Sequence, residues 1–352
     1  MSLRVAILGA NGYGGSGLIR RLRRHPAVGT LALGSRSLAG RPVTEAWPHL
    51  AGLLEGTFTA SEEALEGADV AFLATPHGAT APWVAAALDA GARVVDLSAD
   101  SRLDPDTYRT WYGQHPHPET WEACRYGLVE AHRDELPGAR VVAAPGCNAT
   151  AVSLALLPLA SARLLGEDPA CTVVTGASGA GRAPAQPLHF SELDGNARAY
   201  KPAGTHRHLA EIEATLGRAA EQGRALRTHV PYHPHRVSLT PHLAPMTRGI
   251  LATCTTRLTR DADQDALFEL YEAHYANDPM VHVQEALPDT KAVAGSDRAL
   301  VSLRVDPRDG RVSTFCVIDN LGKGAAGQAV QGFNVAFSHP ETTALEMEAP
   351  WP

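Results

Sequence analysis

Residues 4–25 read RVAILGANGYGGSGLIRRLRRH, and this stretch decides the fold. Residues 4–8 form a short apolar run typical of a buried strand, and residues 17–25 form an amphipathic segment typical of a helix. The glycines between them spell G-x-x-G-x-x-G, a variant of the dinucleotide fingerprint. Residues without a Cβ let the backbone approach a pyrophosphate, and the N-terminus of the next helix stabilises its charge. This context favours a dinucleotide site over a tight turn without a ligand, and the predicted contacts are Gly9, Asn11, Gly12, Tyr13, Gly14 and Gly15.

Strand-like and helical segments alternate after this motif. Short apolar runs lie at residues 31–34, 70–74, 93–97 and 141–144, and an alanine-rich helical segment lies at 81–90. The alternation predicts an α/β fold whose first domain is a doubly wound parallel sheet of the Rossmann type.

The pattern changes after Cys147. Residues 151–165 and 261–276 have helical patterns, and residues 324–337 are apolar at helical spacing. Five later runs are typical of strands: 172–176, 225–230, 249–257, 300–305 and 313–319. They predict a second, α+β domain with a more antiparallel sheet.

Composition excludes several classes of function. The 352 residues suggest two domains, and their formal net charge of −7 argues against a nucleic-acid or anionic-membrane partner. Five widely spaced cysteines without a CxxC pair argue against a disulfide framework or a thiolate zinc knot. The N-terminus lacks the features of a signal peptide, and the longest apolar stretch is too short to span a bilayer. We therefore expect a soluble, cytoplasmic protein.

The end of the second strand bears on the choice of cofactor. An NAD site would place an acidic residue there for the ribose 2′-hydroxyl, but the sequence continues with Ser35, Arg36 and Ser37. A guanidinium and two hydroxyls suit a 2′-phosphate, although a solvated loop arginine is the simpler alternative. We expect NADP(H) as the cofactor.

Cys147 is the candidate nucleophile. It follows a predicted strand and precedes the helical pattern from residue 151, so the helix N-terminus favours its thiolate. A buried core cysteine is the usual alternative, and it suits Cys171, Cys254 and Cys316 better.

Acid/base partners for this thiol are available in THRHLAEI, residues 205–212. Two histidines and a glutamate lead into a helix there, and His233, His235 and His242 are further candidates. A zinc site built on the H-x-H pair is a weaker interpretation, because no third ligand is evident, and we predict no metal. Two loops that follow strands, at 178–182 and 96–102, also have compositions that suit anions.

Together these residues resemble the N-acetyl-γ-glutamyl-phosphate reductase family of the aspartate-semialdehyde dehydrogenase-like superfamily. The resemblance covers essentially the whole chain. It rests on seven ordered motifs: residues 9–15, VDLSADSRL at 95–103, Pro145-Gly146-Cys147, SGAGR at 178–182, THRHLAEI at 205–212, TPHLAPMTRGIL at 240–251 and IDNLGKGAAGQAVQGFN at 318–334.

The resemblance implies NADPH-dependent reductive dephosphorylation of an acyl phosphate through a cysteine thioester. By analogy Cys147 is the nucleophile, His206 moves protons and Glu211 orients His206, with His208 as the substitute for His206 or a substrate contact. Arg102 and Ser98 would bind substrate, and Ser178, Gly179, Ala180, Gly181 and Asn320 would lie near the nicotinamide. The last helix would return to the NADP-binding domain, which gives domains of 1–147 with 320–352 and of 148–319, in a homodimer or homotetramer.

Departures from the family pattern leave a second substrate open. The family commonly has Tyr-Pro after the nucleophile, whereas this chain has Asn148-Ala149, which resembles the lysine-biosynthetic branch acting on carrier-linked α-aminoadipate phosphate. Tyr200-Lys201-Pro202 leans the same way, while SGAGR and TPHLAPMTRG resemble the arginine form. We favour the arginine pathway and a small-molecule substrate, with a carrier protein as partner only in the lysine alternative. A cysteine hydrolase and a non-catalytic NADP-binding protein are the other classes considered.

Overall fold

The computed structural model describes residues 2–222 and 235–351. The predicted strand at 225–230 and the candidate His233 lie outside the described residues. The chain divides into two compact units, one of residues 1–145 and 325–345 and the other of residues 146–324 and 346–352. These bounds differ from the predicted domains by a few residues at each junction and in the assignment of residues 346–352.

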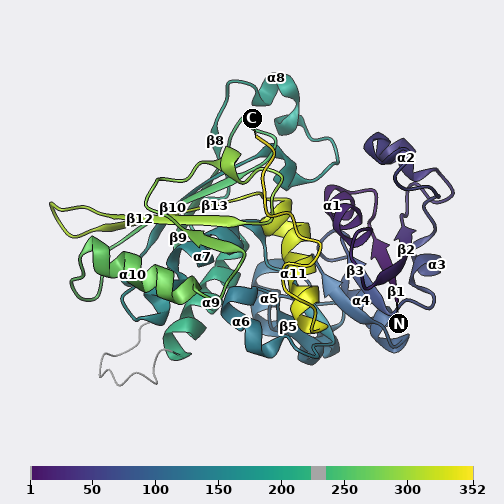
Figure 1. Ribbon diagram of the computed structural model, residues 1–352, viewed down its shortest axis with the longest axis horizontal. Helices are drawn as coiled ribbons and strands as arrows, with labels where there is room; N and C mark the ends of the chain where they lie inside the picture. The colour runs from purple at the N-terminus through teal and green to yellow at the C-terminus, as the bar shows by residue number, and fades with distance from the viewer. Residues whose placement is uncertain (1, 223–234, 352) are drawn as a thin grey trace. The chain divides into compact units, whose positions relative to one another are not determined.

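The first unit contains a parallel six-stranded sheet (Figure 1). Its strand order is β2 (Val28–Gly34), β1 (Leu3–Leu8), β3 (Val70–Leu73), β4 (Arg93–Asp96), β6 (Val141–Ala143) and β5 (Cys124–Tyr126). The helices of this unit are α1 (Tyr13–Leu22), α2 (Val43–Ala46), α3 (Ser61–Leu65), α4 (Ala81–Asp89), α5 (Pro105–Tyr112), α6 (Val129–His132) and α11 (Gly327–Ala336).

Apolar clusters cover both faces of this sheet. Leu18 of α1 and Phe333 of α11 pack with Phe72 in one cluster, while Val84 of α4 packs with Leu73 in another. The predicted doubly wound Rossmann-type sheet is therefore confirmed. Chain direction across the sheet reverses between β1 and β3, so the carboxyl ends of these strands form the switch point at which such sheets bind ligands.

Helix α11 joins the first unit from the far end of the chain. His25, three residues after α1, shares a hydrogen bond of 3.0 Å with Asn334. Arg93 donates to the carbonyl of Ala336 and stacks on Phe337. A five-residue π-helical segment, Gly322–Ala326, precedes α11.

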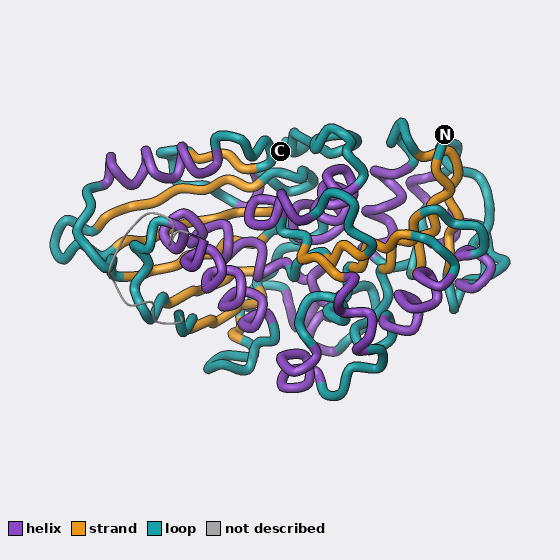
Figure 2. The backbone as a smooth tube through the Cα atoms, turned by 90° about the horizontal axis from the view of Figure 1, so that it is seen from below, coloured by secondary structure: helices purple, strands orange, loops and turns teal. Residues whose placement is uncertain are grey.

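The second unit is built on a mixed seven-stranded sheet, whose strands run as neighbouring paths in Figure 2. Their order is β11 (Val281–Val283), β12 (Ala299–Val305), β13 (Val312–Ile318), β10 (Ile250–Thr256), β7 (Ala170–Thr175), β9 (Ser238–Leu243) and β8 (Arg198–Ala199). Its helices are α7 (Cys147–Ser161), α8 (Phe190–Leu193), α9 (His208–Gln222) and α10 (Gln264–Tyr275). The predicted α+β architecture is confirmed.

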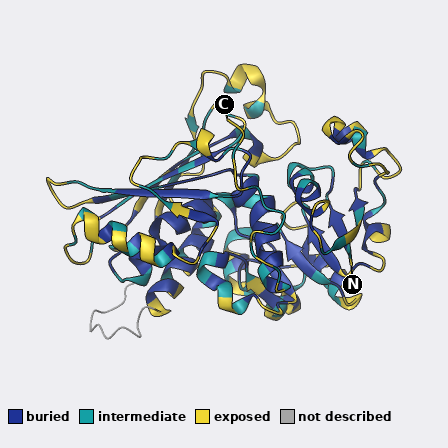
Figure 3. Ribbon diagram, in the orientation of Figure 1, coloured by how far each residue is buried: buried dark blue, intermediate teal, exposed yellow. Residues whose placement is uncertain are grey.

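Burial alternates along the central strand β10. Ala252 and Cys254 are buried, whereas Thr253 and Thr255 are partly exposed, which is typical of a sheet with one covered face. Helix α7 is buried along most of its length and is tied to α10, because the hydroxyls of Tyr271 and Tyr275 donate to its backbone carbonyls. Figure 3 shows the central strands buried and one side of α10 exposed.

Candidate active site

The predicted glycine motif forms the turn between β1 and α1. Gly9 has a φ of +80°, and a Cβ there would lie 2.5 Å from the carbonyl oxygen of Ala74, the residue that follows β3. A Cβ on Gly15 would lie 2.5 Å from the carbonyl oxygen of Gly9, so both glycines are required by close backbone approach. Gly14 differs, because its Cβ would make only ordinary contacts and its backbone remains approachable.

The N-terminus of α1 has the character of an anion site. Its N-cap, Gly12, supplies no side-chain cap, and the first turn carries no acidic residue. The N–H groups of a first helical turn have no intrahelical acceptor and therefore suit an anionic group. A cradle of glycines at the switch point of a parallel sheet thus fits a dinucleotide pyrophosphate.

The segment after β2 contacts this turn. Asn11 donates to the hydroxyl of Ser37 over 3.1 Å, and the buried Ser35 hydroxyl accepts the backbone N–H of Leu38. Arg36 is exposed, and its guanidinium has no hydrogen-bond partner among the described residues. Asn11 and Ser37 are therefore brought together, while Ser35 holds the loop that presents Arg36.

Two carboxylates, Asp96 and Asp100, hold the loop after β4 in place through hydrogen bonds. The buried Asp96 carboxylate accepts the backbone N–H and the hydroxyl of Ser98, and burial raises the pKa of Asp96. Asp100 accepts the backbone N–H groups of Gly78, Thr80 and Ala81 and the hydroxyl of Tyr108. The Ser98 hydroxyl thus has a structural bond within this loop.

Arg102 is also held within the first unit. Its side chain is buried, Nε donates to the carbonyl of Ala144 over 2.8 Å, and Nη2 donates to the carbonyl of Leu97 over 2.7 Å. These bonds fix the guanidinium and brace the chain three residues before Cys147. Its predicted contact with substrate stays a prediction.

Cys147 is the first residue of α7. Four of the five cysteines are buried, whereas Cys147 is partly exposed. Burial raises the pKa of the Cys124 thiol to about 12. The Cys254 thiol lies opposite Cys171 in the sheet, and this contact together with burial raises the pKa of Cys254 well above its ordinary range. Cys124 and Cys254 are consequently protonated, and Cys171 and Cys316 are core residues, which leaves Cys147 as the candidate nucleophile.

Gly146 explains how α7 begins at this cysteine. It is the N-cap, with extended backbone (φ −70°, ψ 144°), and its N–H donates to a carboxylate oxygen of Glu211 over 2.9 Å. A Cβ on Gly146 would lie 2.4 Å from Nε2 of His208, so the imidazole packs directly against the glycine. Any residue with a Cβ at this position would displace that imidazole.

His206 is buried and lies beside the second residue of α7. Its Nδ1 accepts the backbone N–H of His208 over 3.2 Å, and its Nε2 lies 3.4 Å from the Asn148 amide. Burial, helped by repulsion from Lys201, lowers the pKa of His206 to about 4. The imidazole is therefore neutral at physiological pH.

The role of orienting His206, predicted for Glu211, stays a prediction. The polar contacts of His206 are with His208 and Asn148, and Glu211 instead accepts the N–H of Gly146. Helix α9 carries Glu211 in its first turn, three residues after His208, and the carboxylate reaches the N-cap of α7. Glu211 positions the backbone that carries Cys147.

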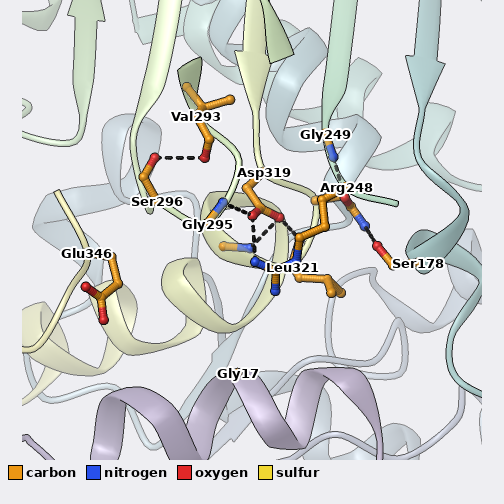
Figure 4. A network of polar contacts seen from close by, with 12 residues as sticks. Gly17, Ser178, Arg248, Gly249, Val293, Gly295, Ser296, Asp319, Leu321 and Glu346 are labelled. Carbon is orange, nitrogen blue, oxygen red and sulfur yellow. Dashed lines mark hydrogen bonds and ion pairs between the residues drawn. The ribbon is translucent and has the colours of Figure 1, made fainter. Parts of the chain in front are cut away.

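The SGAGR loop and Asn320 meet at the end of β7. Asn320 donates to the hydroxyl of Ser178 over 2.9 Å and accepts the N–H of Gly249 over 2.8 Å. Asp319, fully buried, accepts from Arg248 and from the backbone N–H groups of Gly295, Leu321 and Gly322, as Figure 4 shows. This network holds Ser178, Gly179 and Asn320 together in the second unit; Gly181, with a φ of +88°, ends the short helical turn through Ala180.

Three residues near the nucleophile were not predicted as site residues. Asn148 and Tyr200 contact His206, and a Cβ on Gly324 would lie 2.9 Å from the Cβ of Cys147. Asn148 and Tyr200 were noted only as departures from a family pattern. Their proximity depends on the packing of α7 against the segment before α9, which no local pattern reports.

The pH dependence of stability should reflect His206. Unfolded His206 takes up a proton near its ordinary pKa of 6.5, but the folded residue does so only near pH 4. The unfolded state therefore binds more protons between these values, and stability is lost as the pH falls from about 6.5 towards 4. His25, which is buried, and His274, which is partly buried, also have pKa values lowered by desolvation, and they add to this trend. Thermal unfolding measured at several pH values tests this prediction. In a His206→Gln variant, stability should fall less steeply as the pH is lowered.

Neither a metal-binding cluster nor a helix that could span a membrane is present among the described residues. Within residues 2–222 and 235–351, no group of three or more His, Cys, Asp or Glu side chains is arranged to hold a metal ion. In the same part of the chain, every helix is too short or too polar to cross a membrane.

Family models match both units. Residues 4–139 match the semialdehyde dehydrogenase NAD binding domain, and residues 147–320 match the semialdehyde dehydrogenase dimerisation domain. The chain thus combines a nicotinamide-dinucleotide domain with a second domain of the same class of enzyme.

Curated relatives are similar over their full length. The chain is 48% identical to N-acetyl-gamma-glutamyl-phosphate reductase of Thermus thermophilus, over 99% of this chain and 100% of that one. It is 45% identical to the protein of the same name from Symbiobacterium thermophilum and 46% identical to that from Frankia casuarinae, each over 98% of both chains.

Solved structures share the fold at lower identity. Aspartate semialdehyde dehydrogenase II from Vibrio cholerae superposes with a TM-score of 0.70 at 19% identity, covering 95% of this chain and 98% of that one. Aspartate semialdehyde dehydrogenase from Candida albicans gives a TM-score of 0.68 at 16% identity, with the same coverage.

Proposed function

Because the chain belongs to the N-acetyl-γ-glutamyl-phosphate reductase family, we propose that it reduces N-acetyl-γ-glutamyl phosphate to N-acetylglutamate semialdehyde with release of phosphate. This is the oxidoreductase step expected in arginine biosynthesis. The observation that carries the proposal within the chain is a partly exposed cysteine at the first residue of α7, beside a buried neutral histidine.

The residues of the first unit fit a nicotinamide dinucleotide. The glycine turn and the uncapped N-terminus of α1 would hold the pyrophosphate, and Arg36 and Ser37, on the loop held by the buried Ser35, would meet the adenosine ribose. When bound, the cofactor supplies the hydride that reduces the acyl group. The absence of a carboxylate after β2 supports NADP(H) over NAD(H).

The chain's own residues supply covalent and proton-transfer chemistry. Cys147 Sγ would attack the carbonyl carbon of the acyl phosphate; a C–S bond forms, the C–O bond to phosphate breaks, and phosphate leaves. After reduction of this thioester, breaking the C–S bond releases the aldehyde and restores the thiolate. His206, neutral and holding its proton on Nε2, would supply a proton to oxygen during these steps.

The substrate is tested by running the reaction backwards. Free N-acetylglutamate semialdehyde, phosphate and NADP should give NADPH, recorded by its absorbance, and omission of phosphate should stop the reaction. The lysine alternative predicts turnover only with carrier-linked α-aminoadipate semialdehyde. The names of the relatives, which contain N-acetyl-gamma-glutamyl phosphate, support the first outcome.

Removal of the Arg36 guanidinium should change cofactor preference. If Arg36 binds the 2′-phosphate, Arg36→Ala loses a charge-assisted contact of about 1.5–3 kcal/mol, so the KM for NADPH should rise roughly 10- to 100-fold while that for NADH changes little. Arg41→Ala is the matched control, because Arg41 is an exposed arginine of the same unit that pairs with Glu45. Equal losses for both cofactors would contradict a role in 2′-phosphate recognition.

We also propose that the enzyme is a homodimer or homotetramer. The second unit matches a dimerisation-domain model, and the partly exposed residues of β10 leave one sheet face available for a second copy. Location in the cytoplasm stays a prediction.

A further inference from the structure

The side chain of Asn148 is surrounded by three groups that carry protons. It is 2% exposed, its Oδ1 lies 3.9 Å from Sγ of Cys147, and its Nδ2 lies 3.4 Å from both Nε2 of His206 and the hydroxyl of Tyr200. Because this amide is buried, its oxygen should face hydrogen-bond donors and its NH2 group should face acceptors among these three neighbours.

The backbone determines which nitrogen of His206 carries the proton. Nδ1 accepts the N–H of His208, so the neutral imidazole has its hydrogen on Nε2. With Nδ2 of Asn148 facing Nε2, two N–H donors would point at each other. Rotating the amide by a half turn exchanges its oxygen and nitrogen with almost no change in shape, and hydrogen-bond partners decide between the two orientations.

The rotated orientation satisfies all three neighbours. Oδ1 then accepts the Nε2–H of His206 and the hydroxyl hydrogen of Tyr200, and the Nδ2 hydrogens face the sulfur of Cys147. We propose that Asn148 is a positioning residue that directs an amide N–H to the Cys147 thiolate and holds His206 as a neutral Nε2–H donor. This inference rests on the proposed reductase function, for which it assigns the resting places of the protons.

One consequence concerns the first step of the reaction. Because Nδ1 and the Nε2 hydrogen of His206 are both engaged, the imidazole has no lone pair to accept the thiol proton in the resting enzyme. The thiolate is stabilised instead by the N-terminus of α7 and the Asn148 N–H, and His206 keeps its proton for oxygen later in the cycle. Asn148 thus serves chemistry common to both candidate substrates and does not by itself indicate the lysine branch.

Titration of the resting enzyme tests the proposal without turnover. Thiolate formation is followed by ultraviolet absorbance, with Cys147→Ala as the blank, and the protonation of His206 by ¹⁵N NMR. Asn148→Ala removes the N–H, so the thiol pKa should rise by about one unit or more, since a hydrogen bond to a charged group contributes about 1.5–3 kcal/mol and one unit corresponds to about 1.4 kcal/mol. Asn148→Ser, which retains an O–H donor, should recover part of that shift.

Asn148→Asp separates the role of the amide oxygen from that of the amide NH2 group. A carboxylate accepts the Nε2–H but donates nothing to sulfur, so both the thiol pKa and the His206 pKa should rise. Gln222→Glu, which adds the same charge at the exposed end of α9, should change neither. The NMR spectrum of the unmodified enzyme should show the Nε2–H form of His206.

Opposite results overturn the proposal. In the other orientation Oδ1 accepts the S–H hydrogen and favours the thiol, so Asn148→Ala would lower or leave unchanged the thiol pKa. An Nδ1–H form of His206 in the unmodified enzyme contradicts the proposal even if a variant fails to fold. Failure of the proposed function is seen separately, as absence of phosphate-dependent turnover in an enzyme whose titrations behave as described.

Discussion

Cys147→Ala should reduce the phosphate-dependent oxidation of N-acetylglutamate semialdehyde by about 10⁴-fold or more, because no neighbouring side chain can replace the sulfur that forms the thioester. The rate of NADPH formation measures this loss. Protein stability should change little, since Cys147 is partly exposed at a helix start rather than packed in the core.

Cys171→Ala is the matched control for that substitution. Cys171 lies in β7 opposite Cys254, is 2% exposed, and should tolerate alanine with activity within a few-fold of the unmodified enzyme. Rapid alkylation of Cys147, prevented by substrate, should abolish turnover. Full activity in Cys147→Ala would eliminate the covalent mechanism.

His206→Gln should lower kcat by about 10²- to 10⁴-fold, the usual contribution of general acid–base catalysis. Glutamine keeps a polar side chain of similar length but cannot transfer a proton in the same way. The pH dependence of kcat, measured in both proteins, should lose the contribution of this imidazole in the variant.

His208→Gln compares the two histidines of the motif. His208 packs against Gly146, and its backbone N–H, which fixes the tautomer of His206, is retained in the variant. We therefore expect a smaller loss for His208→Gln than for His206→Gln. A reversed order would assign the acid/base role to His208.

The first domain could be predicted well because its determinants are local. The inner strands β1, β3 and β6 are buried over most or all of their length and read as short apolar runs. The glycines at 9 and 15 are required by contacts close in sequence or at the adjacent strand. The long apolar helix after Pro145-Gly146 was predicted in the same way, from residue 151, and the structure begins it four residues earlier, at Cys147.

The contacts of the polar side chains could not be predicted in the same way. Glu211 lies near His206 in sequence, yet it binds the N–H of Gly146, 65 residues away. Ser98 suits an anion by composition, but its hydroxyl binds Asp96. The chemical type of a side chain limits the groups that it can bind, and its neighbours in the folded chain decide which of them it contacts.

Backbone geometry and hydrophobic periodicity act over a few residues, so the sequence alone predicted the two sheet architectures, the dinucleotide turn and the candidate nucleophile Cys147. The reaction was predicted from the resemblance of the sequence motifs to those of the reductase family. Only the tertiary structure decided the arrangement around Cys147, where α7, the segment before α9 and the glycine at 324 meet. The physical reason is that burial and hydrogen-bond partners depend on packing between distant segments, and these set the proton on His206 and give Asn148 its place beside the sulfur.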